Sequence, residues 1–470
     1  MLGNMRLKML SAAACLLWTS CVVGLPLNAQ TLERKQVEDS HWVATWTSMP
    51  QLVEQSNLPP APFTGAGVFK DATLRQTLHM SIGAERIRFL ISNTFGGSAL
   101  PITAASLALP TGGAAGAAGI DTTTLRGLTF NGSSSVTIPQ GQTVYTDPID
   151  VKVEPQSMIT VTLYSQAGQS GTSITGHPGS RTTSWMQQGN HVNASTITGA
   201  NTAHWYFLNA VEAWAPKSTA ALVIIGDSIT DGRGSTDNAN NRWPDLLLAR
   251  MQKEGITNLA VVNQAAGGNS VLSGGLGPPL LQRYKRDLLG TAGVKYGLIF
   301  EGVNDIGSAA TDQGTQSRIS SGLQSAFKTI STEAKAQGIT MFGATITPFG
   351  GNGQAYSNPT RDSARQTVNK WILGGGDGSY TAAIDFSKIL ANPSSPTTLA
   401  TQYDSGDHLH PNPAGYQAIA DQFPLGIFTS QECELLFGSR VLTGLLDYLI
   451  DILLGSQPYR IYCNNAARGY

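Results

Sequence analysis

Charged residues are scarce in this chain of 470 residues. Asp, Glu, Lys and Arg make up 13% of it, and the formal net charge is -1. So weak a charge of either sign gives no reason to expect binding to nucleic acid or to anionic lipid. The sequence also has no repeat of fixed period and no apolar run of the roughly 20 residues that a membrane span needs. With 41% apolar residues it is nonetheless a globular protein, and its length predicts two domains.

Cysteines are few as well, four in all. Cys15 and Cys21 belong to an N-terminal segment that we expect to be removed. Cys433 and Cys463 have no neighbours at the spacing of metal ligands, so the sequence indicates no metal site and no cofactor. In an oxidising compartment these two are predicted to pair as a disulfide.

The N-terminus has the pattern of a secretory signal peptide. Arg6 and Lys8 precede an apolar stretch over residues 9–23. We expect residues 1–24 to be removed, with an alternative cut after Ala29. A short membrane anchor and a lipoprotein site at Cys21 remain as alternatives. The pattern predicts a secreted, extracellular protein.

Residues 41–215 have the features of an all-β domain. Short β-branched segments such as 86–92 and 158–164 are separated by Gly, Pro, Asn and Asp, and no long stretch has a helical period. A sandwich-like arrangement is expected. The sequons at Asn131 and Asn193 are candidate glycosylation sites if the host is eukaryotic.

Residues 216–428 follow a different pattern. Apolar strand-like segments at 220–225, 259–262, 296–300, 339–345 and 383–386 alternate with helical segments at 243–253, 317–337 and 413–423. This alternation predicts an α/β domain with a mostly parallel sheet. The tail, residues 429–470, contains an apolar stretch at 441–454 in which Asp447 and Asp451 share one face, as in an amphipathic helix packed on the body.

Polar residues follow the ends of the predicted parallel strands. They are Gly226-Asp-Ser228, the glycine-rich segment 263–269, the segment 301–305, and Asp407-His-Leu-His410 beyond the last strand. The carboxyl ends of parallel strands share one edge of a sheet, where such folds place their active sites. A serine there needs a base to accept its proton, and a histidine held by a carboxylate meets that need.

These four blocks, in this order, resemble the SGNH, or GDSL-type, hydrolases over residues 218–425. The resemblance implies a flavodoxin-like three-layer fold with a parallel sheet, and hydrolysis of carboxylic esters without a metal. It implies Ser228 as nucleophile, His410 as base and Asp407 as its partner. The Ser228 and Gly268 amides and the Asn304 side chain correspond to the oxyanion donors. The preceding β region resembles, more loosely, the N-terminal half of two-domain secreted members.

Several residues near these blocks have competing interpretations. His408 is the nearest competitor of His410 as base, but the Asp-Xaa-Xaa-His-Pro frame selects His410. We expect Asp227 and Asp305 to orient the turns of Ser228 and Asn304 through backbone hydrogen bonds. His177 either extends over the cleft or is a loop histidine whose hydrogen bonds are satisfied, and the second interpretation is favoured.

The sequence therefore predicts a secreted serine hydrolase that cleaves carboxylic esters through an acyl-enzyme. Acetyl or other short-chain esters of carbohydrates, small or polymeric, are the first expectation for its substrates. The alternatives are a lipase or acyltransferase acting on longer acyl or secondary-metabolite esters, cleavage of a thioester, and a non-catalytic glycan-binding protein. The oligomeric state is left open.

Overall fold

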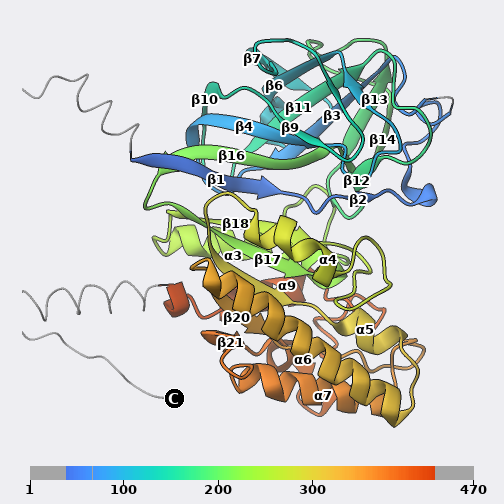
Figure 1. Ribbon diagram of the computed structural model, residues 1–470, viewed down its shortest axis with the longest axis vertical. Helices are drawn as coiled ribbons and strands as arrows, with labels where there is room; N and C mark the ends of the chain where they lie inside the picture. The colour runs from blue at the N-terminus through green and yellow to red at the C-terminus, as the bar shows by residue number, and fades with distance from the viewer. Residues whose placement is uncertain (1–38, 66, 429–470) are drawn as a thin grey trace, which may run out of the picture.

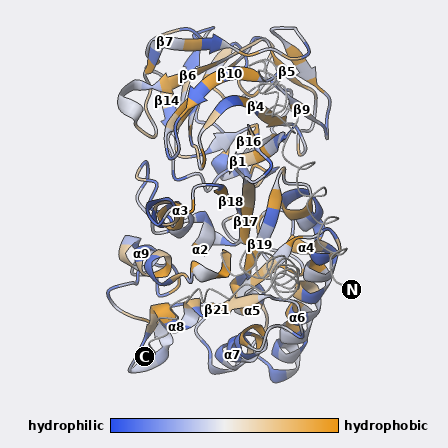
Figure 2. Cartoon of the chain, turned by 90° about the vertical axis from the view of Figure 1, so that its left-hand side faces the viewer, coloured by the Kyte–Doolittle hydropathy of each residue, from blue (hydrophilic) through white to orange (hydrophobic). Residues whose placement is uncertain are grey.

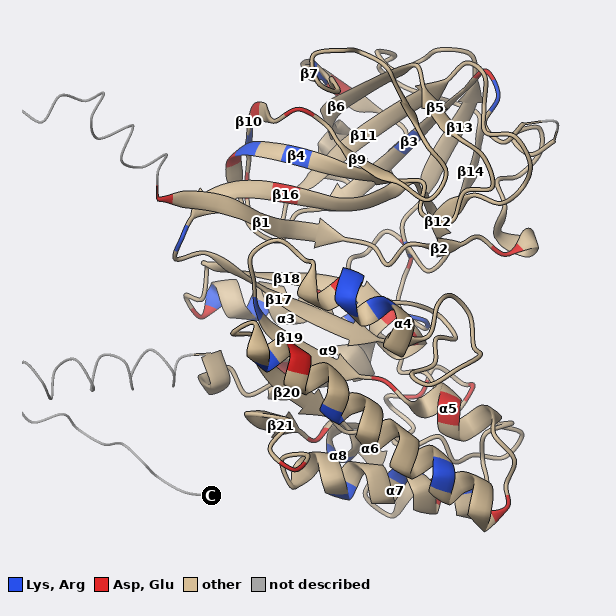
Figure 3. Ribbon diagram, in the orientation of Figure 1, with Lys and Arg blue, Asp and Glu red and all other residues tan. Residues whose placement is uncertain are grey.

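The computed structural model describes residues 39–65 and 67–428. The predicted signal peptide, the tail and all four cysteines lie outside these residues. Within them, no helix has the length and apolar character to cross a membrane. Charged side chains are sparse on the strands and more frequent on helices α3 (Trp243–Lys253), α4 (Leu280–Tyr284), α6 (Gln313–Ala336) and α7 (Pro359–Leu373) (Figure 3).

The first part of the chain consists almost entirely of antiparallel strands (Figure 1). One sheet has the order β1-β16-β4-β10, with β9 paired to β4, and a second has the order β14-β13-β3-β11-β6-β7. Their apolar side chains share one core, to which Phe89 of β4 and Val161 of β11 contribute. The strands are β1 (Ser40–Thr47), β2 (Gln51–Leu52), β3 (Ala72–His79), β4 (Ala84–Ser92), β5 (Leu100–Ile102), β6 (Ala104–Pro110), β7 (Ile120–Gly127), β8 (Val136–Ile138), β9 (Thr143–Tyr145), β10 (Ile149–Val153), β11 (Met158–Ser165), β12 (Thr175–His177), β13 (Ser184–Gln188), β14 (Ala200–Thr202), β15 (Trp205–Tyr206) and β16 (Leu208–Pro216).

The second part is a parallel sheet of order β18-β17-β19-β20-β21 with helices on both faces. Figure 2 shows α3 and α9 on one side of the apolar strands and α4 and α6 on the other. An α/β region with a parallel sheet was predicted from the sequence, and this is confirmed. Its elements are β17 (Ala220–Gly226), α2 (Ser228–Asp231), α3, β18 (Leu259–Ala265), α4, β19 (Val294–Phe300), α5 (Val303–Ser308), α6, β20 (Thr340–Ala344), α7, β21 (Ala382–Ile384), α8 (Phe386–Leu390), β22 (Ala391–Asn392), β23 (Ser395–Leu399) and α9 (Pro413–Gln422).

The strands of this sheet form because their side chains are buried on both faces. In β17, residues 221–226 are all buried, as the uninterrupted apolar run predicts. Helix α9 begins at a cap, since Asn412 Oδ1 accepts a hydrogen bond from the Gly415 amide and Pro413 occupies the first helical position. Helix α3 has the bounds expected from the sequence, whereas α4 and α7 were not predicted.

The two parts are joined by hydrogen bonds along β1 and the turn after β3. The Ala44 amide donates to Ala292 O (2.9 Å), and Thr47 Oγ1 donates to Asn263 O (3.0 Å). Val43 and Ala44 belong to the apolar core of the α/β part. The β part therefore lies directly on the edge of the parallel sheet that carries β18.

Candidate active site

Ser228 lies just beyond the carboxyl end of the interior strand β17 and opens the short helix α2. Asp227 caps that helix, since its Oδ1 accepts a hydrogen bond from the Ile229 amide (3.0 Å). Asp227 thus holds the turn of Ser228 through the backbone, as expected from the sequence. The serine is 7% exposed and lines a pocket.

Ser228, His410 and Asp407 form a continuous chain of hydrogen bonds. The Ser228 Oγ to His410 Nε2 distance is 2.7 Å, and the His410 Nδ1 to Asp407 Oδ2 distance is 2.6 Å. A carboxylate only accepts, so Nδ1 carries the hydrogen and Nε2 is left to accept from the serine. The other Asp407 oxygen accepts from the Leu409 and His410 amides, at 3.0 and 2.8 Å, which fixes the carboxylate in its turn.

The protonation states of His410 and Asp407 are suited to accepting a proton from Ser228. Burial lowers the pKa of His410 below 6.5, although Asp407 opposes the shift, so the ring is neutral near pH 7. Partial burial acts to raise the pKa of Asp407, but hydrogen bonds from the His410 backbone and ring hold it at about 2. An ionised Asp407 stabilises the positive charge that His410 takes up when it accepts a proton.

The His408 side chain contacts Asp404 and not Ser228. Its Nδ1 lies 2.5 Å from Asp404 Oδ2, and its side chain is 41% exposed. It does not line the pocket that contains Ser228.

Three N–H groups near Ser228 are free to bind an anionic oxygen. In the described part of the chain the Ser228 and Gly268 amides have no acceptor, whereas the Gly267 amide donates to Asp231 Oδ2 (2.9 Å). Gly268 has a φ of +68°, and a Cβ there would lie 3.0 Å from Leu276. This left-handed conformation favours glycine. The third group is the side-chain amide of Asn304 in α5.

Two hydrogen bonds hold the Asn304 amide in one orientation. Its Nδ2 donates to Asn269 O (2.7 Å), and its Oδ1 accepts from the Tyr356 hydroxyl (3.0 Å). Burial raises the pKa of Tyr356, so the phenol keeps its proton and acts as the donor. The second Nδ2 hydrogen has no acceptor among the residues that the structure describes, and Asn304 lines the pocket. Sequence reasoning did not find Tyr356.

Asp305 was expected to support the turn of Asn304. The structure differs, since its carboxylate accepts from the Val271 and Leu272 amides (2.8 and 2.9 Å). It therefore connects α5 to the segment after the glycine loop.

His177 connects the β part to the glycine loop. It lies on β12, and its Nε2 is 2.8 Å from Asp231 Oδ1, while its Nδ1 is 3.0 Å from Met49 O. Both side chains are buried. Because Asp231 also accepts from the Gly267 amide, the β part holds the loop that presents Gly268. The sequence favoured a loop histidine with satisfied hydrogen bonds; both ring nitrogens do have partners, but the residue lies on β12 and one partner, Asp231, belongs to the α/β part.

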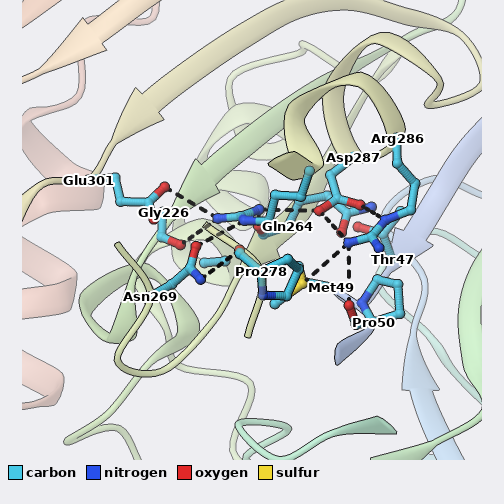
Figure 4. A network of polar contacts seen from close by, with 12 residues as sticks. Thr47, Met49, Pro50, Gly226, Gln264, Asn269, Pro278, Arg286, Asp287 and Glu301 are labelled. Carbon is cyan, nitrogen blue, oxygen red and sulfur yellow. Dashed lines mark hydrogen bonds and ion pairs between the residues drawn. The ribbon is translucent and has the colours of Figure 1, made fainter. Parts of the chain in front are cut away.

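A buried arginine organises the polypeptide beneath the same loop. Arg283 Nε donates to Asn269 Oδ1 (2.9 Å), and the guanidinium pairs with Glu301 (3.2 Å) and Asp287 (3.3 Å). It also donates to the carbonyls of Gln264 and Gly226. Figure 4 shows Gly226, Gln264, Asn269 and Glu301 around this network, which continues through Asp287 to Arg286 and to Pro50 of the β part.

Buried carboxyl groups accompany that arginine. Burial raises the pKa of Asp227 to about 7 and that of Glu301 to about 8. Burial also raises the pKa of Asp305. These groups retain protons at a pH where exposed carboxyls are ionised. They lie within the protein, and neither Glu301 nor Asp305 lines the pocket.

Both parts of the chain line the pocket, whose volume is about 430 Å³. The β part contributes Gln51, Glu54, Asn57, Pro178, Gly179, Arg181 and His204. The α/β part contributes Ser228, Asp231, Arg233, Gly267, Gly268, Leu276, Asn304, Tyr356, Leu409 and His410. Within the described residues, no group of three His, Cys, Asp or Glu side chains could hold a metal ion.

The glycosylation sites and the disulfide stay predictions. Asn131 and Asn193 are exposed, and their glycosylation stays a prediction. Cys433 and Cys463 lie outside the described residues, as do the predicted signal peptide and tail helix.

Comparisons with known proteins address the α/β part. The model of the GDSL-like lipase/acylhydrolase family matches residues 224–418. An acetyl xylan esterase from Geobacillus stearothermophilus is 21% identical, with 44% of this chain and 94% of that chain covered and a TM-score of 0.32. A GDSL-like lipase from Bacteroides thetaiotaomicron is 15% identical (46% and 91% covered, TM-score 0.34). A member of the lipolytic G-D-S-L family from Veillonella parvula is 18% identical (45% and 100% covered, TM-score 0.34). No curated protein matches the sequence.

The family match supports a carboxylic ester hydrolase, as the sequence predicted. Residues 224–418, which the model of that family matches, contain Ser228, Gly268, Asn304, Asp407 and His410.

Proposed function

We propose that the protein is a serine esterase in which Ser228, His410 and Asp407 act as a catalytic triad. The observation that carries this proposal is the chain of bonds from Ser228 Oγ through His410 to Asp407, at 2.7 and 2.6 Å. The parallel sheet supports the family assignment, since its order, 2-1-3-4-5 in chain sequence, is that of flavodoxin-like folds.

The reaction proceeds in two displacements. Ser228 Oγ attacks the ester carbonyl carbon while His410 Nε2 takes its proton, and Asp407 stabilises the imidazolium. The carbonyl oxygen becomes an oxyanion, which binds the Ser228 and Gly268 amides and the Asn304 side chain. His410 then returns the proton to the leaving alcohol. Water, deprotonated by His410, attacks the acyl-enzyme and releases the acid.

The pocket favours small acyl groups. Pro178, Leu276 and Leu409 are the aliphatic side chains that line it, and most of the other lining groups are polar. A long acyl chain needs an extended apolar surface, which this lining does not provide. We propose acetyl or short-chain esters of polar alcohols, carbohydrates among them, as substrates. We further propose export, on the basis of the signal pattern in residues 1–24.

A series of p-nitrophenyl esters from acetate to palmitate tests the activity and the acyl length. We expect kcat/KM to be highest for the shortest esters. Ser228→Ala and His410→Ala should each lower kcat by roughly 10⁴-fold or more, with the fold intact by circular dichroism. His408→Ala is the matched control and should retain activity, because His408 lies outside the pocket. Turnover by Ser228→Ala comparable to that of the wild type would contradict the proposal.

A further inference from the structure

Two arginines in the pocket differ from every other arginine that the structure describes. Within residues 39–65 and 67–428, Arg181 and Arg233 alone donate no side-chain hydrogen bond and form no ion pair. Both line the pocket that contains Ser228. Arg233 is exposed and Arg181 is partly buried. A guanidinium has five N–H donors and is permanently charged, so two that line one pocket without a protein partner are available to bind an anionic ligand.

Burial makes the case of Arg181 stronger. Its Nε is shielded from solvent and has no hydrogen-bond partner. Buried donors in proteins nearly always have a partner, and an exception is expected where a ligand supplies it.

The backbone holds Arg181 in place at a strained position. Its φ is +49°, in the left-handed region that is uncommon for residues other than glycine. Ser180 Oγ bridges this turn by donating to Thr182 O (2.8 Å), and Arg181 O accepts from the Asn238 amide (2.8 Å). Strain maintained by such contacts is a feature of ligand-binding sites.

Arg233 comes from the turn that follows the nucleophile. Its amide donates to Ser228 O (2.9 Å), and its carbonyl accepts from the Tyr416 hydroxyl (2.6 Å). Burial lowers the pKa of His410, and the positive charges of Arg233 and Arg181 lower it further. Both guanidinium groups therefore lie within electrostatic range of the reacting atoms.

The carboxylates of the same pocket are engaged with other partners. Asp231 is bonded to His177 and to the Gly267 amide. Glu54 accepts from the side-chain amides of Gln51 (2.5 Å) and Asn57 (3.0 Å). Neither forms an ion pair with Arg181 or Arg233, so the two positive charges remain available to a ligand.

We propose that Arg181 and Arg233 form a subsite for a carboxylate on the substrate, which makes the preferred substrate an ester that carries an acid group near the scissile bond. An O-acetylated uronic acid unit of a saccharide is an ester of this class. The subsite rests on the proposed esterase function. Arg181 comes from the β part and Arg233 from the α/β part, so the β part takes part in substrate selection.

Two acetyl esters that differ only in charge test the subsite. They are 4-(acetoxymethyl)benzoate and 4-(acetoxymethyl)benzamide. We expect the wild type to prefer the carboxylate by roughly tenfold to a hundredfold in kcat/KM, because each hydrogen bond between charged groups contributes that order of discrimination. Arg181→Gln and Arg233→Gln should each bring this ratio toward one. Arg126→Gln, an exposed arginine of the β part, is the matched control and should leave the ratio as in the wild type.

The outcomes separate the subsite from the esterase function. If the wild type cleaves neither ester nor p-nitrophenyl acetate, the esterase function is wrong. If it cleaves both esters with equal kcat/KM, the subsite is wrong and the esterase function stands. Preference for 4-(acetoxymethyl)phenyl phosphate over the benzoate would overturn the assignment to a carboxylate. Should the arginine variants fail to fold, the wild type alone decides: salt at about 0.5 M should lower kcat/KM for the benzoate and leave that for the amide unchanged.

Discussion

Tyr356→Phe is the most informative single substitution, because it removes one hydroxyl and leaves the ring in place. In the wild type that hydroxyl donates to Asn304 Oδ1 (3.0 Å), while Asn304 Nδ2 donates to Asn269 O (2.7 Å). Without the hydroxyl, the bond to Asn269 is the only one from the described residues that still orients the Asn304 side-chain amide. The fraction of molecules in which its free N–H faces the oxyanion should fall.

The size of the effect follows from these two bonds. A neutral hydrogen bond contributes about 0.5–1.5 kcal/mol, so kcat should fall by roughly twofold to twelvefold. Loss of the donor itself, in Asn304→Ala, should cost about 10²–10³-fold in kcat, which sets the upper limit. Because the lost interaction belongs to the transition state, kcat and kcat/KM should fall together and KM should stay unchanged.

A double-mutant cycle with p-nitrophenyl acetate is the assay. If Tyr356 acts through Asn304, then adding Tyr356→Phe to Asn304→Ala should cause little further loss of kcat. An equal fractional loss in both backgrounds would show that Tyr356 acts independently, and the reasoning would be refuted. An unchanged kcat in the single variant would refute it too.

Three further predictions concern pH and stability. The pH profile of kcat/KM for a neutral ester should rise through an inflection below 6.5, since His410 must be neutral to accept a proton and its burial lowers its pKa; an inflection above 6.5 would contradict this. Burial raises the pKa of Glu301 from 4.5 to about 8, so the folded protein holds a proton there that the unfolded chain loses, and this contribution to stability declines as the pH rises. We therefore expect that, in urea unfolding, the free energy of unfolding of Glu301→Gln rises relative to that of the wild type as the pH increases from 5 to 8. A difference between the two proteins that does not change with pH would argue against this. His177→Ala should lower the free energy of unfolding by about 3–5 kcal/mol, because the buried Asp231 would lose its ion-pair partner and keep the Gly267 amide as its donor, and a loss near zero in the same assay would contradict a structural role for the pair.

The short-range features of the site could be predicted from the sequence. Asp407 and His410 are three residues apart in one turn, and Asp227 caps the helix that Ser228 opens. The placement of Ser228 opposite His410, 182 residues away, followed from the rule that parallel strands end at one edge of the sheet.

Contacts between residues that are far apart in the sequence could not be predicted from local sequence patterns. Tyr356 lies in a segment rich in Gly and Asn, 52 residues from Asn304, and only the folded chain brings them together. His177 and Asp231 belong to different parts of the protein and meet across their interface. Such contacts depend on how β12 lies against the α/β part, which neither periodicity nor composition specifies.

Helix α7 was missed for another reason. Its buried face carries Arg365 and Asn369 beside Ala364, Val368 and Ile372, which weakens the apolar period. Arg365 and Asn369 are hydrogen-bonded to the backbone of Ile346, two residues beyond the end of β20. The sequence feature that could have predicted the start of this helix is its N-terminal cap. The Asn358 side chain accepts a hydrogen bond from the Thr360 amide (2.9 Å), and Pro359 occupies the first helical position.

Covalent labelling by diethyl p-nitrophenyl phosphate tests the central claim most directly. An activated serine attacks phosphorus and expels p-nitrophenol, leaving a diethylphosphoryl group on its Oγ. We predict that mass spectrometry of the intact protein will show one such group per chain, that peptide mapping will place it on Ser228, and that Ser228→Ala will remain unmodified. A wild-type protein that stays unmodified, or one labelled at another residue, would contradict the assignment of Ser228 as the nucleophile.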